Sequence, residues 1–367
     1  MEISLIIYGS LDLLTGGWIY DRRLVEYLRE QGHSVEVISL RQRKYVGNLM
    51  DNFSRRLHRR SWAGNCRLLL EDALSHPSLI GLNHRIRQTR SFPIVTIVHQ
   101  VLCRQPSGKI RQLFYRAFER RYFQSVDGYI FNSETTRRNV GGLHNHQRPS
   151  IVAYPGGDRL GSLAAPETIE SRCRRSGPIR LIVVGNLTPN KGILPLIRAL
   201  SGLPPNEWHL TIVGSLTMDR RHARKIGALV DRLGLAARVD IRGPLDGRDL
   251  VECLIRSHLF VLPFSYEGFG MACLEAMAWG LPVIGSAAGA TAELVEDAVS
   301  GVLIAPGDVN ALAECIHHLH THRDQLADYS RAALEKFRHR PGWRDSLHKI
   351  HSFLLSMAGH PKSNTHG

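Results

Sequence analysis

The chain of 367 residues lacks the closely spaced cysteines of a metal site or a redox pair. Its six cysteines stand far apart, at positions 66, 103, 173, 253, 273 and 315. In a chain of this length, such spacing is typical of reduced, buried thiols and of a cytoplasmic protein. The sequence also shows no cluster of acidic and histidine ligands, so we expect no metal and no other cofactor.

A run of about 20 apolar residues, the length that spans a bilayer, is also missing. The first residues, 1–7, carry no basic segment and lead into Gly9 and Asp12. They are therefore interpreted as a first core strand and not as a signal peptide. We expect any membrane contact to be peripheral, on the inner face of the membrane.

Acidic residues are few, with 33 Asp and Glu against 47 Lys and Arg, and the formal net charge is +14. Such a charge does not define a fold, but it favours anionic partners: nucleic acid, phosphorylated substrates or an acidic lipid surface. No recognition motif for nucleic acid accompanies it, so no nucleic acid partner is expected. The length exceeds the size at which one core usually stops growing, which predicts two domains.

Short apolar runs alternate with segments of helical spacing, a pattern that predicts parallel α/β structure. The pattern fails between 159 and 178, where we place a linker, and then resumes. The predicted domains are therefore 1–165, which would bind the acceptor, and 178–335, which would bind the nucleotide sugar. A helical pattern spans 331–357, and we expect a last helix near 340–358 to pack back onto the first domain. Both domains are predicted to be Rossmann-like and doubly wound, facing each other across a cleft at the carboxyl ends of their strands.

The strongest motif lies within 263–282, where a glycine turn joins a predicted strand to a predicted helix. The helix N-terminus offers free N–H groups that suit a diphosphate. Glu267 precedes this N-terminus, and Glu275 lies about 6 Å inside the helix. Carboxylates accept hydrogen bonds from hydroxyls, so the spacing favours a ligand with a central diphosphate and a sugar at each end. The alternative is an ordinary strand–helix turn with two surface glutamates.

A second motif, 183–192, follows the first predicted strand of the second domain and ends in Lys191 and Gly192. Lys191 is well placed as a point charge on a phosphate, where it would neutralise charge on a leaving diphosphate. The alternative is a solvated lysine in a helix-start loop. A third and weaker motif is Gly16–Gly17, where paired glycines would let backbone amides approach a phosphate.

These residues resemble the pattern of the family 4 glycosyltransferases, retaining enzymes of GT-B fold. The two glutamates of the family, with seven residues between them that include glycine and an aromatic, are matched by Glu267, Phe269, Gly270 and Glu275. Further matching residues are Gly185, Leu187, Lys191, Gly192, Gly289, 293–295, 301–303, 306–308, 16–17, 32–33, 132–134 and 155–158. The resemblance covers nearly the whole chain and is loose between 41 and 125.

The resemblance implies a role for each matching residue. Glu275 would bind the nucleotide ribose, and Glu267 would hold hydroxyls of the donor sugar and serve catalysis. Lys191 and the amides of Gly270 and Met271 would hold the diphosphate. The further donor contacts would be Gly16, Gly17, Asn186 and Phe269. His99, which follows the predicted strand 94–98, matches a family histidine at the reaction centre, although a lone histidine at a strand end is more often structural.

Asn186 departs from the family pattern, which usually has an arginine there to pair with the lysine. An amide can donate a hydrogen bond to a phosphate but brings no charge, and charged hydrogen bonds are about twice as strong. Another basic residue could substitute, or donor affinity could be lower, or the enzyme could be impaired.

Two basic segments stand out in the first domain. The first combines Arg41, Arg43, Lys44, Arg55, Arg56, Arg59 and Arg60 with Leu49, Met50, Phe53, Leu57 and Trp62. It is typical of an interfacial segment, so 41–62 is predicted to contact an anionic membrane surface. The second combines Lys109, Arg111, Arg116, Arg120 and Arg121 with Ile110, Leu113, Phe114, Ala117 and Phe118. There we favour a core-facing helix with a solvated basic face.

The sequence thus predicts retaining, metal-independent transfer of a hexose-type sugar from a UDP- or GDP-sugar to an acceptor hydroxyl, on a glycan or a lipid-linked acceptor. The resemblance suggests a same-face mechanism in which the leaving phosphate helps to take the acceptor proton. Two alternatives stay open. One is a catalytically weak nucleotide-sugar-binding protein at the membrane, and the other is a different GT-B enzyme such as a sugar-nucleotide epimerase or a phosphorylase.

Overall fold

The computed structural model describes residues 1–13, 15–54, 66–89, 91–144, 147–161 and 163–359. The chain divides into two compact units. Unit 1 combines Met1–Pro155 with the C-terminal segment Pro341–Gly367, and unit 2 is Gly156–Arg340.

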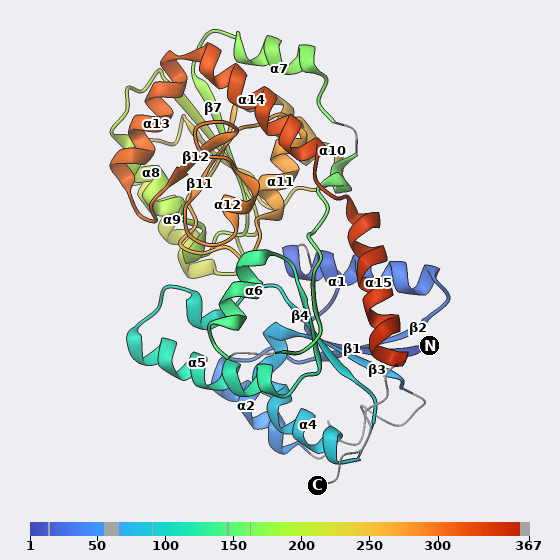
Figure 1. Cartoon of the computed structure of the whole chain (residues 1–367). Helices are drawn as coiled ribbons and strands as arrows, with labels where there is room; N and C mark the ends of the chain where they lie inside the picture. Colours follow the sequence, from blue (N-terminus) through green and yellow to red (C-terminus); the bar gives the residue numbers. More distant parts are fainter. Residues whose placement is uncertain (14, 55–65, 90, 145–146, 162, 360–367) are drawn as a thin grey trace. The chain divides into compact units, whose positions relative to one another are not determined.

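Unit 1 is built on a parallel sheet, in which the described residues form six strands in the order β2-β1-β3-β4-β5-β6 (Figure 1). The strands are β1 Glu2–Tyr8, β2 Ser34–Leu40, β3 Leu68–Asp72, β4 Ile94–Val98, β5 Gly128–Phe131 and β6 Ser150–Val152. The helices are α1 Gly16–Glu30, α2 Tyr45–Leu49, α4 His76–Thr89, α5 Lys109–Gln124, α6 Glu134–Gly141 and α15 Trp343–Gly359. The strand order reverses direction beside β1, as in doubly wound sheets, which bind ligands at the carboxyl ends of their strands.

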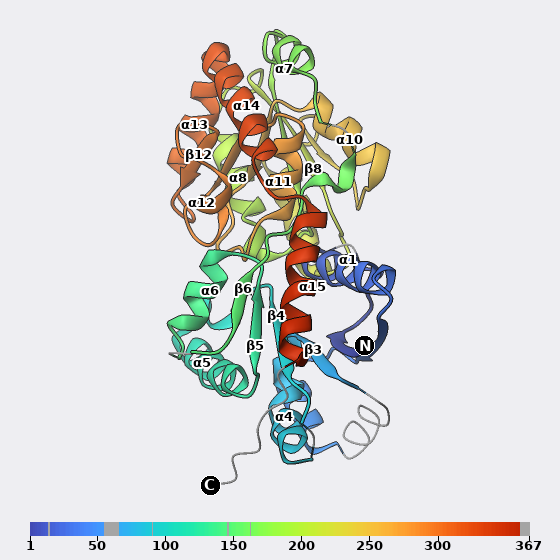
Figure 2. The ribbon, with the colours of Figure 1, turned by 45° about the vertical axis from the view of Figure 1, so that its right-hand side comes forward.

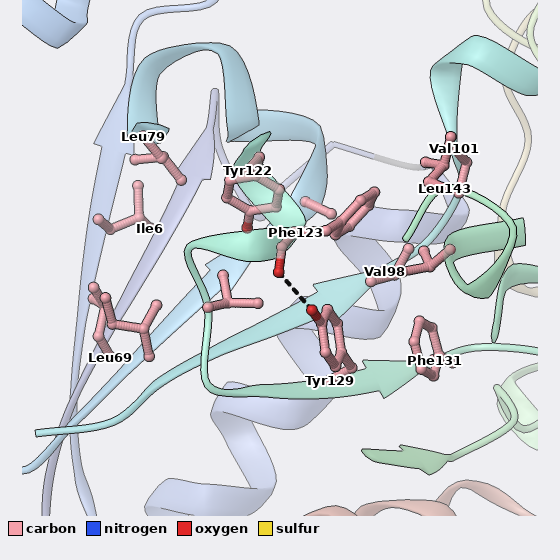
Figure 3. Packing of buried hydrophobic residues seen from close by; sticks show 14 of the residues in the cluster. Ile6, Leu69, Leu79, Val98, Val101, Tyr122, Phe123, Tyr129, Phe131 and Leu143 are labelled. Atoms are coloured by element: carbon pink, nitrogen blue, oxygen red, sulfur yellow. Dashed lines mark hydrogen bonds between the residues drawn. The ribbon is translucent and has the colours of Figure 1, made fainter. Parts of the chain in front are cut away.

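The core of unit 1 lies between the sheet and its helices. Figure 3 shows Ile6 and Leu69 of the sheet on the same side as Tyr122 and Phe123 of α5. The hydroxyl of Tyr129 donates to the carbonyl of Phe123, so the aromatic part of the core also carries a satisfied polar group. Strands such as β3 and β4 are buried along their whole length, which is expected of a parallel sheet covered on both faces.

The helix α15 belongs to unit 1, although it lies about 190 residues beyond the rest of that unit in the sequence. It lies against α1 in both views (Figures 1 and 2), where the rings of Trp343 and Tyr20 meet edge to face with centroids 5.5 Å apart. The helical pattern predicted over 331–357 is two helices, because α14 ends at Arg338 and α15 begins at Trp343. Pro341 and Gly342 stand between them and interrupt the helical backbone.

Unit 2 is also built on a parallel sheet, with the order β12-β11-β10-β7-β8-β9 among the described residues. Its strands are β7 Ile179–Val184, β8 Trp208–Val213, β9 Val239–Ile241, β10 Leu259–Leu262, β11 Val283–Ser286 and β12 Gly301–Ile304. Its α-helices are α7 Pro166–Cys173, α8 Ile193–Ser201, α9 Arg220–Arg232, α10 Gly247–Arg256, α11 Met271–Ala278, α12 Thr291–Leu294, α13 Val309–Thr321 and α14 Arg323–Arg338. The prediction of two doubly wound α/β domains is confirmed.

The linker predicted over 159–178 is instead ordered structure within unit 2. The helix α7 occupies its middle, and α7 buries Ile169, Arg172 and Cys173. Arg172 donates to the carbonyls of Trp279 and Gly280 at the end of α11, so this basic residue satisfies helix carbonyls inside the unit. The helix has eight residues and too few apolar positions for a visible period, which explains why the sequence pattern missed it.

Candidate active site

In unit 2, the helix α11 begins directly after a glycine turn, as the sequence predicts. Gly270 has φ 99° and precedes the first residue of α11, and only glycine adopts such a conformation without strain. No side chain caps the helix, and the N–H groups of Met271 and Ala272 make no hydrogen bond to any described residue. These free donors, with the positive end of the helix dipole, form a site suited to an anion.

Lys191 and Glu267 lie beside this helix end and form an ion pair, with Nζ 3.0 Å from Oε2. Lys191 ends the short 3-10 helix Pro189–Lys191, which follows β7, and its ammonium lies 4.6 Å from the ring centroid of Phe264. Each side chain keeps 21% of its surface exposed, so both remain accessible to a ligand. The structure thus brings together two predicted residues that are 76 positions apart.

Two tight backbone contacts hold the loops that carry this pair. Gly192 has φ +70°, and a Cβ there would lie 2.1 Å from the carbonyl oxygen of Pro263. Gly289 has φ +83°, and a Cβ there would lie 2.3 Å from the carbonyl oxygen of Glu267. The N–H of Ala290 donates to the same oxygen at 3.0 Å. The loops after β7, β10 and β11 therefore fix the backbone of Glu267 and the approach of Lys191.

Glu275 lies inside α11 and is 5% exposed, and both of its oxygens accept hydrogen bonds from Arg159, a residue of the predicted linker. The Nε of Arg159 donates to Oε1 at 2.7 Å, and its Nη2 donates to Oε2 at 3.1 Å. Arg159 also donates through Nη1 to Asp246. Burial raises the pKa of the Glu275 carboxyl, and Arg159 opposes that shift without cancelling it. The sequence could have indicated Arg159, because this residue directly follows 155–158, which match the family pattern.

Asn186 and Phe269, both predicted to contact the donor, have structural contacts of their own. The Oδ1 of Asn186 accepts a hydrogen bond from the N–H of Ser215 at 3.1 Å, which joins the loops after β7 and β8. That contact leaves the NH₂ group of the amide for a phosphate. Phe269 is 2% exposed, so its ring packs inside unit 2 and offers little surface to a ligand.

In unit 1, Gly16 and Gly17 are the first residues of α1. A Cβ on Gly17 would lie 3.2 Å from Cδ2 of His99, closer than side chains normally pack. Gly17 therefore lets the imidazole of His99 lie against the start of α1. This close approach of a side chain differs from the backbone–phosphate approach that the sequence suggested.

His99 follows β4 and is held from several sides. Its Nε2 lies 2.9 Å from Oδ1 of Asp21 in α1, and its carbonyl accepts a hydrogen bond from the side chain of Asn132 at 2.9 Å. The ring of Tyr20 meets the imidazole edge to face at a centroid distance of 5.2 Å. Burial disfavours the imidazolium, but the carboxylates of Asp21 and then Asp72 outweigh it, so the pKa of His99 is raised.

The expectation that the chain has no cluster of acidic and histidine side chains is wrong, because Asp21, Asp72 and His99 form one. Their ligand atoms lie within 4.8 Å of one another, and all three residues are buried. They come from α1, the end of β3 and the end of β4, which the sheet order places at the same edge. Spacing along the sequence could not show this, because the three residues meet only through strand order.

The helix α5 does not have the orientation that its sequence pattern suggested. Ile110 is 87% exposed and Leu113 is 65% exposed, whereas Glu119, Tyr122 and Phe123 are its buried residues. The predicted core-facing stripe is therefore wrong, because Phe114 and Ala117 are exposed as well and Phe118 is only half-buried. Lys109, Arg111, Arg116, Arg120 and Arg121 are all exposed as well.

The first basic segment, 41–62, is described only as far as residue 54. Arg55, Arg56, Leu57, Arg59, Arg60 and Trp62 lie outside the described residues. Within the described part, Met50 is 63% exposed and Phe53 is 74% exposed. Tyr45 of α2 packs against Phe114 and Tyr115 of α5, which places this segment beside α5. No helix of the described residues has the length and apolar character needed to cross a bilayer.

Two similar solved structures place the fold in a known class. Sucrose-phosphate synthase from Thermosynechococcus elongatus is 20% identical, with a TM-score of 0.82 and coverage of 98% of this chain and 99% of that one. The Anabaena protein HepE, solved with UDP-glucose, is 20% identical, with a TM-score of 0.74 and coverage of 97% and 100%. Both likenesses support a two-domain GT-B fold.

The sequence matches "Glycosyltransferase Family 4" over 15–159 and "Glycosyl transferases group 1" over 166–336. The chain therefore belongs to the family 4 glycosyltransferases, as its motifs predict. A curated relative is D-inositol 3-phosphate glycosyltransferase of Mycobacterium sp. (strain KMS), which is 30% identical over 206 residues, or 55% of this chain and 46% of the relative. The chain spans about half the length of this relative.

Proposed function

We propose that this protein transfers a hexose-type sugar from a nucleoside diphosphate, UDP or GDP, to an acceptor hydroxyl. The observation that carries the proposal is the ion pair of Lys191 and Glu267 beside the uncapped N-terminus of α11. Together these groups offer a cation, a hydrogen-bond acceptor and free backbone donors at one place. A diphosphate bonded to a sugar needs all three.

Each group would serve a different part of the donor. The N–H groups of Met271 and Ala272 would bind the diphosphate, and Lys191 would neutralise the charge that grows on it as the sugar departs. Glu267 would accept hydrogen bonds from the sugar hydroxyls. Glu275 would accept from the ribose through lone pairs that Arg159 leaves available.

The transfer is proposed to retain the anomeric configuration and to need no metal ion. Lys191 and the helix dipole supply the positive charge that a metal ion supplies in other phosphate sites. The carboxylate of Glu267 lies 3.0 Å from the Lys191 ammonium, which favours a binding role over attack on the sugar. The leaving phosphate would then take the acceptor proton on the same face of the sugar.

The test combines thermal-shift screening with turnover assays on UDP-, GDP- and ADP-sugars. One nucleotide sugar should raise the unfolding midpoint and be consumed, with the sugar transferred in retained configuration. Glu267→Ala should reduce transfer by orders of magnitude while the unfolding midpoint stays near that of the wild type. Near-normal turnover in Glu267→Ala would refute its role, and an isomerised free sugar would identify an epimerase instead.

We further propose that the acceptor is a glycan or a lipid-linked sugar reached at an anionic membrane surface. Support comes from the surface of α5, here called the α5 surface and defined by exposed Ile110, Leu113 and Phe114 with the five exposed basic residues of that helix. The acid in α5, Glu119, is buried and bonded to the N–H groups of Leu102 and Cys103. Exposed apolar groups beside unopposed basic charge suit an anionic lipid interface.

Sedimentation with vesicles tests this membrane contact. Binding should increase with the anionic lipid fraction, and binding independent of lipid charge would contradict the proposal.

A further inference from the structure

The cluster of Asp21, Asp72 and His99 contains more negative charge than one imidazolium can balance. Asp21 is 0% exposed and Asp72 is 2% exposed, so water does not solvate either carboxylate well. The Oδ1 of Asp72 accepts from the N–H of Leu74 at 2.9 Å, and Oδ1 of Asp21 is bonded to His99. The other oxygen of Asp21, Oδ2, is buried and has no hydrogen-bond partner among the described residues. Two ionised carboxylates this close in a dry site repel strongly, so one of them should hold a proton.

The electrostatics around the cluster identify Asp72 as that proton carrier. Burial, and then repulsion from Asp21, raises the pKa of Asp72 to about 7. Asp21 acts on the imidazole through its charge and its hydrogen bond, whereas Asp72 raises the pKa of His99 only while it is ionised. Around them, the described titratable neighbours include the phenols of Tyr20 in α1, Tyr8 in β1 and Tyr122 in α5, whose pKa values burial raises far above neutrality. A proton on Asp72 therefore leaves a single carboxylate charge in the cluster beside a cationic His99.

The second ring nitrogen of His99, Nδ1, is not held by the two carboxylates of the cluster. Nδ1 makes no hydrogen bond to any described residue and is not among their buried unsatisfied atoms, so it keeps some exposed surface, although His99 as a whole is only 6% exposed. The imidazole orientation is determined by the hydrogen bond to Asp21 and by the ring of Tyr20, which packs against it edge to face. The hydroxyl of Tyr20 in turn donates to the carbonyl of Ala153. An imidazolium held in this way offers one N–H donor outward.

We propose that Asp21 is a positioning residue for His99: as a buried carboxylate bonded to Nε2 it holds the imidazole and favours its cationic form, so that Nδ1–H donates to a substrate oxygen. This inference rests on the glycosyl transfer proposed above, because it gives His99, which the family resemblance places at the reaction centre, a role in that reaction. The family pattern indicated only His99, whereas the structure shows that Asp21 and Asp72 lie beside it in one buried cluster.

The first test observes the imidazole directly and needs no substrate. The ring nitrogens of ¹⁵N-histidine-labelled protein are followed by NMR against pH, and the His99 signal is identified by its loss in His99→Gln. In the wild type, both ring nitrogens should stay protonated to higher pH than those of an ordinary histidine, because the pKa of His99 is raised. Asp21→Asn should lower the titration midpoint by about one to three units, because it removes the opposite charge. Glu26→Gln, which removes an exposed charge from the same helix, should leave the midpoint unchanged.

Asp72→Asn separates the two carboxylates. If Asp72 is protonated at neutral pH, replacing it with a neutral amide should shift the His99 midpoint much less than Asp21→Asn does. An equal shift would overturn the assignment of the proton to Asp72. An unchanged midpoint in Asp21→Asn, or a stoichiometric metal ion bound to these side chains in the purified protein, would overturn the proposal as a whole.

The second test uses the pH profile of transfer. Activity that needs the imidazolium falls as pH rises through the His99 pKa, so this alkaline limb should move to lower pH in Asp21→Asn. At pH 7, kcat should fall about ten- to hundredfold, the value of a charged hydrogen bond, while KM for the donor changes little. Absence of transfer by the wild type with every nucleotide sugar would refute the proposed function and leave the NMR test valid. Transfer with an unshifted profile in Asp21→Asn would refute only the positioning role.

Discussion

Arg159 donates to both carboxylate oxygens of Glu275, from Nε at 2.7 Å and from Nη2 at 3.1 Å. The two side chains are only 12% and 7% exposed, so water contributes little to either charge. The carboxylate expected at the ribose therefore already belongs to an ion pair of the fold. A nucleotide must share Glu275 with Arg159, which makes Arg159 important for both stability and donor binding.

Removal of Arg159 should destabilise unit 2 because it leaves a buried carboxylate without its partner. Arg159→Met is expected to lower the free energy of unfolding by about 3–5 kcal/mol. Arg159→Met combined with Glu275→Gln should recover much of that loss. Urea denaturation of the two single variants and the double variant measures the coupling. Arg174→Met, at a side chain that is 81% exposed, should change stability very little. Strictly additive effects at positions 159 and 275 would contradict the pairing.

Loss of the Lys191 charge should slow sugar transfer much more than it weakens the fold. Lys191→Met is expected to lower kcat/KM about a hundredfold or more, because a cation that stabilises a departing diphosphate contributes on that scale. Lys225→Met, which removes an exposed lysine from α9, serves as the control for net charge. Steady-state kinetics with the identified donor decide the question, and similar rates in the two variants would argue against a role for Lys191.

A methyl group at Gly289 should displace Glu267 without touching any ligand. Gly289→Ala brings a Cβ to 2.3 Å from the Glu267 carbonyl at φ +83°, whereas Gly234→Ala meets the similar φ of +68° with no atom within 4 Å. Both variants carry backbone strain of about 1–3 kcal/mol. Only Gly289→Ala should also lose transfer activity, as measured on protein whose fold is verified by circular dichroism. Equal activities would show that the contact does not position Glu267.

The buried Glu71 should make the stability of unit 1 depend on pH. Burial raises the pKa of Glu71 to about 8 from an ordinary value of 4.5, despite the hydrogen bond from Asn83. Between these values the native protein keeps a proton that the unfolded chain loses, so stability falls as pH rises. Glu71→Gln removes this decline, and its unfolding midpoint relative to the wild type should be higher at pH 8 than at pH 5. Glu36→Gln, at an exposed position, should show no such pH dependence. A constant difference for Glu71→Gln across this range would contradict the raised pKa.

The α5 surface should lose vesicle affinity when its exposed apolar side chains are removed. Insertion of a leucine side chain into lipid contributes about 1.5–3 kcal/mol, so Leu113→Ser should weaken binding to anionic vesicles about tenfold or more. Leu355→Ser changes a leucine in α15 that is 47% exposed and serves as the matched control. Co-sedimentation at fixed ionic strength provides the measurement. If both serine variants bind as the wild type does, the α5 surface is not the membrane contact.

The sequence by itself determined the doubly wound α/β class, the glycine turn before α11 and the placement of Glu267 and Lys191 beside it. Those features follow local rules, because every loop that follows a strand of a parallel sheet begins at the same edge, where the carboxyl ends of the strands lie. Only the tertiary structure decided that Arg159 pairs with Glu275, that Asp21 and Asp72 surround His99, and that Ile110 and Leu113 face outward. These relationships join residues far apart in the chain, or depend on which face of a helix finds a neighbour. Strand order and packing settle them, and spacing along the chain does not encode them.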